Sequence, residues 1–403
     1  MRSPVAMISY SSKDGDAAEL IHDELALRCF EVIHDRHSFQ DGGRVPASME
    51  RGVERCDVFV GYLTPHSLYL NAASRSPRPA LEQELIPALQ RRRASLGSGT
   101  RERPIVILVS HGLGNRATAG ETVRRLTGEP ADTLWSLSID QDTDHITQPE
   151  AAELANRALQ AFLATEPTGT AVTLSVTTRG TRPEPRRFTI DGTRLFGGER
   201  RPGDPANWTR FVTAANCVEQ TLKASCGPGT VRIDAACHLS AALAVGRVFH
   251  QASGWSPAFS TRHGHATPSS MGRTARLRGD LDPYEASGDV IVDIDLIGHD
   301  VADRASRLAT AMPRGGGRLS LSRSDAGDLS PTEISDLARG VADKIRSAHA
   351  RLKPSTIHLM MAVPAAFAGL LGHHLSALQA DIVAYELGDD SYAPAVTLRR
   401  TTP

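Results

Sequence analysis

The sequence predicts an α/β protein of two domains, and three observations lead to this prediction. The chain has 403 residues, which is longer than a single hydrophobic core usually supports. Its first 165 residues alternate short apolar runs with amphipathic segments, the pattern of parallel strands joined by crossover helices. The remainder, residues 166–403, contains two further strand-to-helix units, which indicates a second α/β domain.

Five strands are expected in the first domain, at residues 5–10, 31–34, 58–63, 104–109 and 133–139. Each is followed by turn residues and then a helical pattern, so the strands should form a parallel sheet covered by helices. A helix over residues 149–164 leads into Thr-Glu-Pro-Thr-Gly-Thr at 165–170. Proline and glycine in a polar stretch are typical of a linker, so we place the domain border there.

In the second domain the first elements are a strand at 171–177 and a helix at about 208–225. Two strand-to-helix units follow, one at 231–249 and one at 356–372, and a strand at 289–297 lies between them. Both units have a buried apolar strand, a tight turn and a helix that contains glycine, namely Gly246 in one and Gly369 and Gly372 in the other. This shared plan indicates two duplicated halves.

Charge and cysteine usage exclude several classes of protein. The net charge of -1 argues against bulk DNA binding, although residues 166–403 carry a net +3 against -4 for residues 1–165, which favours an anionic partner for the second domain. Five cysteines without a Cys-x-x-Cys pair suit a reducing cytoplasm and predict no metal site. No apolar stretch is long enough for a membrane span, so we expect a cytoplasmic protein.

Three motifs in the first domain follow one another in a characteristic order. They are Met7-Ile-Ser-Tyr-Ser-Ser-Lys-Asp, Phe30-Glu-Val-Ile-His-Asp and Cys56-Asp-Val-Phe-Val-Gly-Tyr-Leu-Thr-Pro-His-Ser. Their order and spacing closely resemble a TIR domain over about residues 4–165, which implies a flavodoxin-like parallel sheet. TIR domains include interaction adaptors and enzymes that cleave NAD+, so the resemblance alone does not decide between these functions.

Cleavage of the nicotinamide–ribose bond builds positive charge on the ribose, so a carboxylate held against the sugar favours the transition state. In NAD+-cleaving relatives this acid is a glutamate on the helix after the third strand, and Glu84 fits that position. Glu82 is the rival, because a Trp-Cys pair that often precedes the glutamate is replaced here by a Ser/Arg/Pro insertion. Alternatively, both are solvated acids near a helix N-terminus.

The TIR resemblance also implies a set of residues that contact NAD+. After the first strand these are Tyr10, Ser11, Ser12 and Lys13, although helix capping is an alternative role, above all for Ser12. The loop 36–46 resembles a loop that gates the pocket or touches a neighbouring TIR domain. The remaining residues of this set are Arg36, Phe39 and Ser67.

Residues 166–403 resemble a SAVED domain, the sensor of bacterial anti-phage systems that make cyclic oligonucleotides (CBASS). The two units at Ile233-Asp-Ala-Ala-Cys-His and His358-Leu-Met-Met-Ala-Val carry the resemblance, which implies two fused Rossmann-like, CARF-like halves. Helix N-termini suit phosphates and aromatic faces suit bases. The candidate ligand residues are His238, Leu239, Ser240, Trp255, His299, Ala365, Phe367 and Tyr392.

Core packing is an equally good role for each of these aromatic residues and histidines, and the arginine-rich segment 179–201 is better explained as a solvated face. Together the two resemblances imply an effector that hydrolyses NAD+, its substrate, without a cofactor. A cyclic oligonucleotide, with cyclic tri-adenylate as our choice, would drive self-association into an oligomer or filament that completes the TIR sites. The alternatives are a TIR scaffold without activity and a hydrolase acting on the cyclic nucleotide itself.

Overall fold

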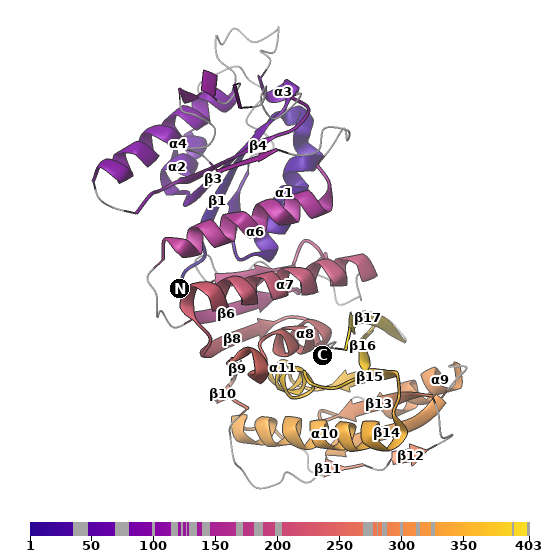
Figure 1. The fold of residues 1–403 in the computed structure, drawn as a ribbon. Helices are drawn as coiled ribbons and strands as arrows, with labels where there is room; N and C mark the ends of the chain where they lie inside the picture. The colour runs from indigo at the N-terminus through magenta and orange to yellow at the C-terminus, as the bar shows by residue number, and fades with distance from the viewer. Residues whose placement is uncertain are drawn as a thin grey trace. The chain divides into compact units, whose positions relative to one another are not determined.

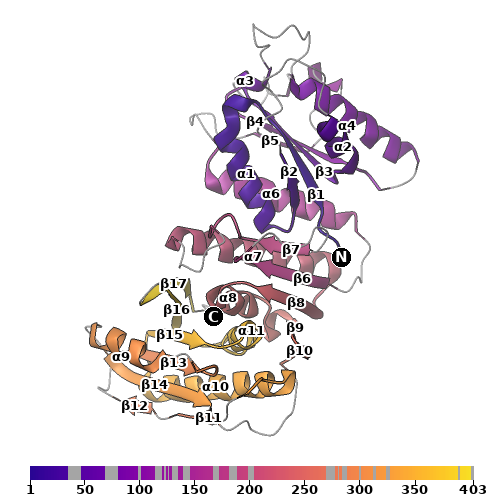
Figure 2. The same ribbon diagram turned by 180° about the vertical axis from the view of Figure 1, so that it is seen from behind.

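The structure is a computed structural model with two compact units (Figures 1 and 2). One unit comprises residues 2–169 with 184–189, and the other comprises Met1, residues 170–183 and residues 190–403. The two units are described separately. The residues described are 1–34, 47–68, 80–98, 101–113, 120–121, 124–125, 127–128, 135–138, 146–166, 172–180, 188–197, 204–268, 277–279, 281–283, 288–298, 301–311, 315–323, 327–388 and 391–400.

The N-terminal unit contains a parallel sheet in the order β2-β1-β3-β4-β5. The predicted strands are confirmed, with ends that differ by one or two residues. Because the strand order reverses at β1, the carboxyl ends of β1 and β3 flank the position where open α/β sheets bind ligands. The strands are β1 (Val5–Ser9), β2 (Glu31–Ile33), β3 (Val58–Leu63), β4 (Ile105–Ser110) and β5 (Trp135–Ser138).

Helices cover both faces of this sheet, with α1 and α6 on one face and α2 and α4 on the other (Figures 1 and 2). On the second face Val5 and Met7 of β1 pack with Leu63 of β3 and Leu85 of α4. Burial of this apolar face fixes α4 against the sheet. The helices are η1 (Ser12–Asp14), α1 (Gly15–Leu27), α2 (Ala47–Arg55), α3 (Pro65–Leu68), α4 (Ala80–Gly97) and α6 (Gln148–Ala164).

A buried ion network joins the strands at their amino-terminal ends. Asp57, which is 2% exposed, accepts two hydrogen bonds of 2.7 Å from Arg2 and one of 2.9 Å from the Val5 amide. Arg103 pairs with both Asp57 and Glu166. Burial raises the pKa of Asp57, but the hydrogen bonds from Arg2 and Val5 and the charges of Arg103 and Arg2 outweigh burial, so the net pKa is lowered.

We expect Asp57→Asn to destabilise the N-terminal unit by about 2–3 kcal/mol at pH 7, somewhat less than a fully buried pair because Arg2 is half exposed. The folded pKa lies below the unfolded value, so the carboxylate stabilises above about pH 4 and this contribution is lost as the pH falls through the folded pKa. Calorimetry should therefore show a difference at pH 7 that shrinks in acid. Glu121→Gln, which removes a 62% exposed acid, is the control; equal melting of the two variants would contradict the expectation.

The C-terminal unit contains two mixed sheets in its described part. The first has the order β10-β9-β8-β6-β7, and the second has the order β11-β14-β13-β15-β16-β17 with β12 paired to β14. The first sheet is built from β6 (Val172–Thr177), β7 (Phe188–Asp191), β8 (Thr230–Ala236), β9 (Ser256–Thr261) and β10 (Gly264–Ala266). The second is built from β11 (Leu277–Arg278), β12 (Leu281–Pro283), β13 (Asp289–Asp295), β14 (Gly315–Arg323), β15 (Thr356–Ala362), β16 (Asp381–Leu387) and β17 (Tyr392–Leu398).

The two predicted strand-to-helix units are β8 with α8 (Leu239–Val248) and β15 with α11 (Ala365–His374), and each element of the second unit begins 126 residues after its counterpart. The helices α8 and α11 pack directly on each other. Gly246 approaches the Gly369 carbonyl, and Gly372 approaches the Leu243 carbonyl. A shift of 126 residues exchanges these two contacts, so the contact itself reflects the duplicated halves. The remaining helices are α7 (Pro205–Cys226), η3 (Gln251–Ser253), α9 (Val301–Ala311) and α10 (Pro331–Leu352).

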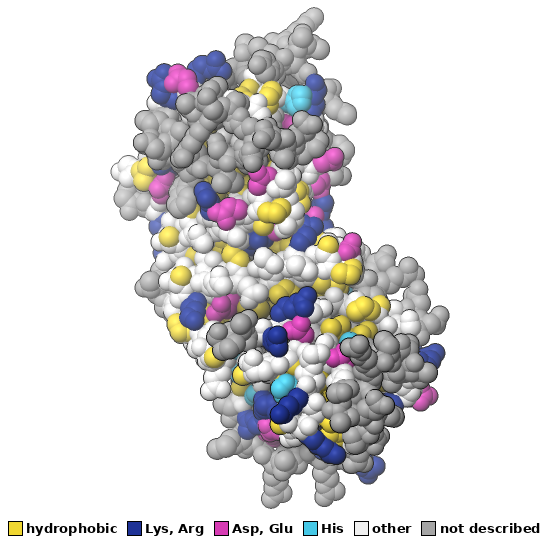
Figure 3. Space-filling model, turned by 45° about the vertical axis from the view of Figure 1, so that its right-hand side comes forward, with side chains coloured by type: hydrophobic (Ala, Val, Ile, Leu, Met, Phe, Trp, Pro, Cys, Tyr) yellow, Lys and Arg dark blue, Asp and Glu magenta, His cyan; other side chains and the backbone are white. Residues whose placement is uncertain are grey.

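The described surface carries few large hydrophobic groups. Leu96, Ile297 and Leu387 are the large hydrophobic side chains that are more than a third exposed among the described residues, and Figure 3 shows hydrophobic side chains in small, separate groups on one face. No described helix has the length and apolar character needed to cross a bilayer. The five cysteines are all free thiols, and the described residues contain no cluster of metal-ligating side chains.

Candidate functional site

The carboxyl ends of β1 and β3 bring together most of the described residues predicted to contact NAD+. Tyr10 directly follows β1 and is buried, whereas Ser12 and Lys13 are exposed. The hydroxyl of Thr64, the residue after β3, donates a 2.6 Å hydrogen bond to the Asp14 carboxylate. This bond ties the segment after β1 to the segment after β3, so the two loops form one edge.

Two serines at this edge have local structural bonds. The Ser11 hydroxyl caps η1 by accepting a 3.4 Å bond from the Lys13 amide, so the capping role considered for Ser12 belongs to Ser11. The Ser67 hydroxyl donates to the Thr64 carbonyl at 3.1 Å and accepts from the Thr64 amide at 2.8 Å. Ser67 therefore shapes the turn into α3, and its hydroxyl is already engaged there.

Glu84 is a buried acid in the first turns of α4, with only 2% of its surface exposed. Leu85 belongs to the same buried apolar cluster as Leu63, and Arg91, two turns further along α4, donates to the Cys56 carbonyl just before β3, so the start of α4 lies toward the carboxyl end of the strand. The glutamate is therefore held at the carboxyl end of the sheet and does not lie on a solvated helix face. The side chain of its rival, Glu82, and the predicted residues Arg36 and Phe39 lie outside the described residues.

In the C-terminal unit, the predicted residues His238 and Ser240 lie at the start of α8. The His238 ring is fully buried and its Nδ1 is 2.7 Å from the Thr178 hydroxyl. The Ser240 amide donates a 2.7 Å hydrogen bond to the carboxylate of Glu386. Arg179, which follows β6, donates to the same carboxylate at 3.1 Å. The N-terminus of α8 therefore already holds an anionic group of the protein's own.

Glu386 is the last but one residue of β16 and is 3% exposed. Burial raises the pKa of its carboxyl, although the bond from Ser240 and the charge of Arg179 oppose this effect. The arginine-rich segment, interpreted as a solvated face, thus contributes at least one residue to a partly buried ion pair.

Two predicted base-stacking residues belong to the core, and these assignments are corrected. Trp255 is 3% exposed, and its indole N–H donates a 2.7 Å bond to Glu219. Phe367 is fully buried. Neither ring has a face available to a base. Tyr392 is different, because it is only partly buried and lies opposite Leu387, the residue after Glu386.

The other predicted residues of this set are less informative. Leu239 and Ala365 open α8 and α11 and are partly buried. The side-chain bonds between the two helices join their C-terminal ends: Arg247 donates to the Leu375 carbonyl at 3.3 Å, and the His373 ring contacts the Phe249 carbonyl at 3.0 Å. The predicted residue His299 lies outside the described residues.

Comparison with protein families agrees with this geometry. Residues 7–121 match the model of the TIR domain family, and residues 216–398 match SAVED, the "SMODS-associated and fused to various effectors sensor domain". The chain joins a TIR domain to a SAVED domain. None of the curated proteins matches it.

Among solved structures, the SAVED/CARF-domain containing receptor Cap4 of Acinetobacter baumannii with the cyclic trinucleotide 2'3'3'-cAAA is similar in fold. It has a TM-score of 0.51 and 16% identity, over 97% of this chain and 99% of that one. The Cap4 receptor of Moraxella osloensis has a TM-score of 0.43 and 13% identity, over 96% of this chain and 98% of that one. The first similarity supports the fold of the SAVED domain with CARF-like halves.

Sequence reasoning missed Ser9 in the TIR domain. Side chains alternate along a strand, so Ser9 shares the sheet face of Val5 and Met7, which is the face that α4 covers. Ser9 is 1% exposed, and its hydroxyl has no hydrogen-bond partner among the described residues. A buried polar atom without a partner is costly unless a ligand or water satisfies it. Ser9 is therefore a further candidate contact at the edge that holds Glu84.

A hydrogen-bonded pair of side chains joins two strands at the same edge of the sheet. The Tyr62 hydroxyl and Nδ1 of His111 are 2.8 Å apart, which joins the ends of β3 and β4. Burial and the charge of Asp14 raise the pKa of Tyr62, so the phenol stays neutral and serves as a fixed polar group. No motif distinguishes these residues from other strand residues, and only the register of the sheet brings them together.

Proposed function

We propose that the TIR domain hydrolyses NAD+ to nicotinamide and ADP-ribose when a cyclic oligonucleotide binds the SAVED domain. The observation that carries this proposal is the burial of Glu84 in the first turns of α4, toward the carboxyl end of the TIR sheet. A scaffold has no need of a buried acid at this position, because burying a carboxylate costs free energy. A catalyst that stabilises a cation gains from it.

The chemistry requires one well-placed negative charge. As the nicotinamide–ribose bond breaks, the ribose becomes cationic and nicotinamide leaves as a neutral molecule. A carboxylate about 4 Å from that charge contributes about 4 kcal/mol at an effective dielectric of 20, which is about three orders of magnitude in rate. Glu84 supplies the charge, while Tyr10 and the buried Ser9 hydroxyl orient the substrate. Glu84 needs no cofactor for this step.

Control by the SAVED domain follows from the danger of continuous NAD+ loss. Moving an equilibrium from 1:99 to 99:1 requires about 5.5 kcal/mol of preferential ligand binding. A cyclic trinucleotide, the class of ligand solved with the Acinetobacter receptor, offers three phosphates and three bases for this purpose. We propose that it binds near Arg179 and the first turn of α8, with Tyr392 against a base. The resulting self-association completes the TIR sites.

The deciding experiment incubates the purified protein with NAD+ and a panel of cyclic di-, tri- and tetranucleotides, and measures nicotinamide release and particle mass by light scattering. We expect release with one class of nucleotide, together with a rise in mass. If NAD+ stays intact with every nucleotide, the TIR domain is a scaffold without activity. If the cyclic nucleotide is degraded, the protein is a hydrolase that acts on the cyclic nucleotide itself. Nicotinamide release without a rise in particle mass would show that self-association is not required for activity.

Glu386 provides a test of where the nucleotide binds. Its carboxylate would repel a phosphate about 8 Å away by about 2 kcal/mol at an effective dielectric of 20. We therefore expect Glu386→Gln, which keeps the shape and loses the charge, to tighten nucleotide binding at least about tenfold in calorimetry. Asp343→Asn, which removes a 63% exposed acid of the same domain, should bind like the unaltered protein. Equal affinity of both variants would place the phosphates away from α8.

A further inference from the structure

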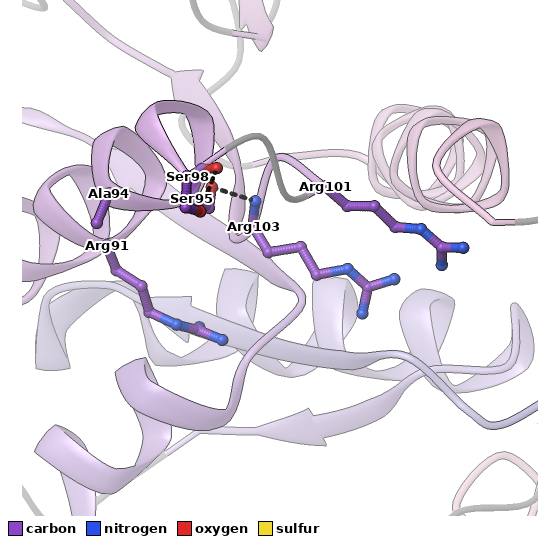
Figure 4. Close-up of a pocket in the computed structure, with 6 residues that line it drawn as sticks. All are labelled: Arg91, Ala94, Ser95, Ser98, Arg101 and Arg103. Carbon is purple, nitrogen blue, oxygen red and sulfur yellow. Dashed lines mark hydrogen bonds between the residues drawn. The ribbon is translucent and has the colours of Figure 1, made fainter.

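A cavity of about 620 Å³ lies at the opposite end of the TIR sheet from Glu84. Its walls come from Arg91, Ala94, Ser95 and Ser98 of α4 and the segment after it, and from Arg101 and Arg103 before β4 (Figure 4). Glu84 and Ser95 are eleven residues apart on α4, which corresponds to about 16 Å along the helix axis. The cavity is therefore separate from the proposed NAD+ site.

The arginines around this cavity outnumber the acids that pair with them. Arg101 and Arg103 share Glu166, at 3.3 Å for Arg101. Arg103 also shares Asp57 with Arg2. These three arginines are thus balanced by two carboxylates, which leaves one positive charge.

Arg91 adds a second uncompensated charge. Its guanidinium donates to the main-chain carbonyls of Val53 at 2.8 Å and Cys56 at 2.6 Å, and carbonyl groups carry no net charge. Within the described part of the chain it forms no ion pair with an acid. Among the described residues, the cavity therefore has an excess of two positive charges, which favours a multiply charged anion.

Two serine hydroxyls reduce the repulsion that the C-terminal end of α4 would exert on an anion in the cavity. The carbonyls at the C-terminal end of a helix repel negative charge. Here the Ser95 hydroxyl donates to the Arg92 carbonyl at 2.7 Å, and the Ser98 hydroxyl donates to the Ser95 carbonyl at 2.9 Å. Both serines therefore satisfy carbonyls of α4, while the Arg103 amide donates to the Ser95 hydroxyl at 3.0 Å.

We propose that this cavity binds a pyrophosphate group, either free or carried by a nucleotide. Planar guanidinium groups donate paired hydrogen bonds that match phosphate oxygens. The volume lies within the range of about 300–1,000 Å³ that small-molecule sites occupy. Arg101, whose side chain is 45% exposed, is the group best able to turn toward the ligand without loss of the buried network.

The test measures binding of inorganic pyrophosphate and of ADP to the full chain by calorimetry at low salt. We expect saturable binding that weakens with added salt. Arg101→Gln should reduce the affinity about tenfold, the loss of one charge-assisted hydrogen bond. Arg124→Gln, which removes an arginine 61% exposed and paired with Glu121, is the matched control. Binding of both compounds shows that the pyrophosphate is sufficient, and binding of ADP alone shows that the nucleoside is also required; both results support the site.

Two results would overturn the proposal. One is the absence of saturable binding by either compound. The other is equal affinity of Arg101→Gln and Arg124→Gln, which would place the anion elsewhere. Nicotinamide release separates this site from the proposed NAD+ site, because Arg101→Gln should weaken pyrophosphate binding and leave the nucleotide-dependent release rate unchanged.

Discussion

Replacing Glu84 by glutamine should reduce nucleotide-dependent nicotinamide release by about three orders of magnitude, the largest functional effect that we expect from one substitution. Glutamine has nearly the same shape as glutamate, so the variant removes the charge and preserves the packing of the buried side chain. The lost interaction exists mainly in the transition state, so kcat should fall while KM changes little. Single-turnover measurement of nicotinamide release provides the rate.

Two controls separate the role of Glu84 from general damage. Glu153→Gln removes a 49% exposed acid of α6 that pairs with Arg157, and its rate should equal that of the unaltered protein. Glu82→Gln tests the rival acid on the same helix. Binding of the cyclic nucleotide to the SAVED domain should be unaffected in all three variants. Full activity in Glu84→Gln with strong loss in Glu82→Gln would transfer the catalytic role to Glu82.

The sheets could be predicted from the sequence because buried parallel strands consist of continuous runs of apolar residues. Val58–Leu63 illustrates this, since its predicted and observed ends coincide. The position of Glu84 could also be predicted, through the resemblance to a TIR domain. Its burial could not be predicted, because burial depends on how the apolar face of α4 packs on the strands of the sheet.

Side-chain partners distant in sequence explain the predictions that failed. Trp255 carries both an aromatic face and an N–H, which suits a base-stacking role as well as a core role. The choice is decided by Glu219, 36 residues away. In the same way, nothing local to Glu386 predicts its bond to the Ser240 amide, 146 residues earlier. Pairings of this kind arise from the fold, and pattern reading within one segment cannot supply them.

Gly246→Ala should have the largest effect on stability. A methyl group at this position would lie 1.7 Å from the Gly369 carbonyl oxygen and 2.6 Å from its carbon, so α8 and α11 would have to move apart. Both obstructing atoms belong to the backbone, and a rotamer change cannot relieve the contact. We expect a loss of about 3 kcal/mol, near the upper end of overpacking effects. For a domain of about 240 residues this lowers Tm by roughly 6–12 °C.

The matched control is Gly229→Ala in the same domain, where a methyl group meets nothing within 4 Å and Tm should change little. Gly372→Ala is the symmetry-related test, because its methyl group would lie 2.0 Å from the Leu243 carbonyl oxygen. If the two halves form one duplicated unit, Gly246→Ala and Gly372→Ala should lower the Tm of the SAVED transition by similar amounts and weaken nucleotide binding together. A melting curve for Gly246→Ala that overlays that of Gly229→Ala would mean that α8 and α11 are not packed through their glycines.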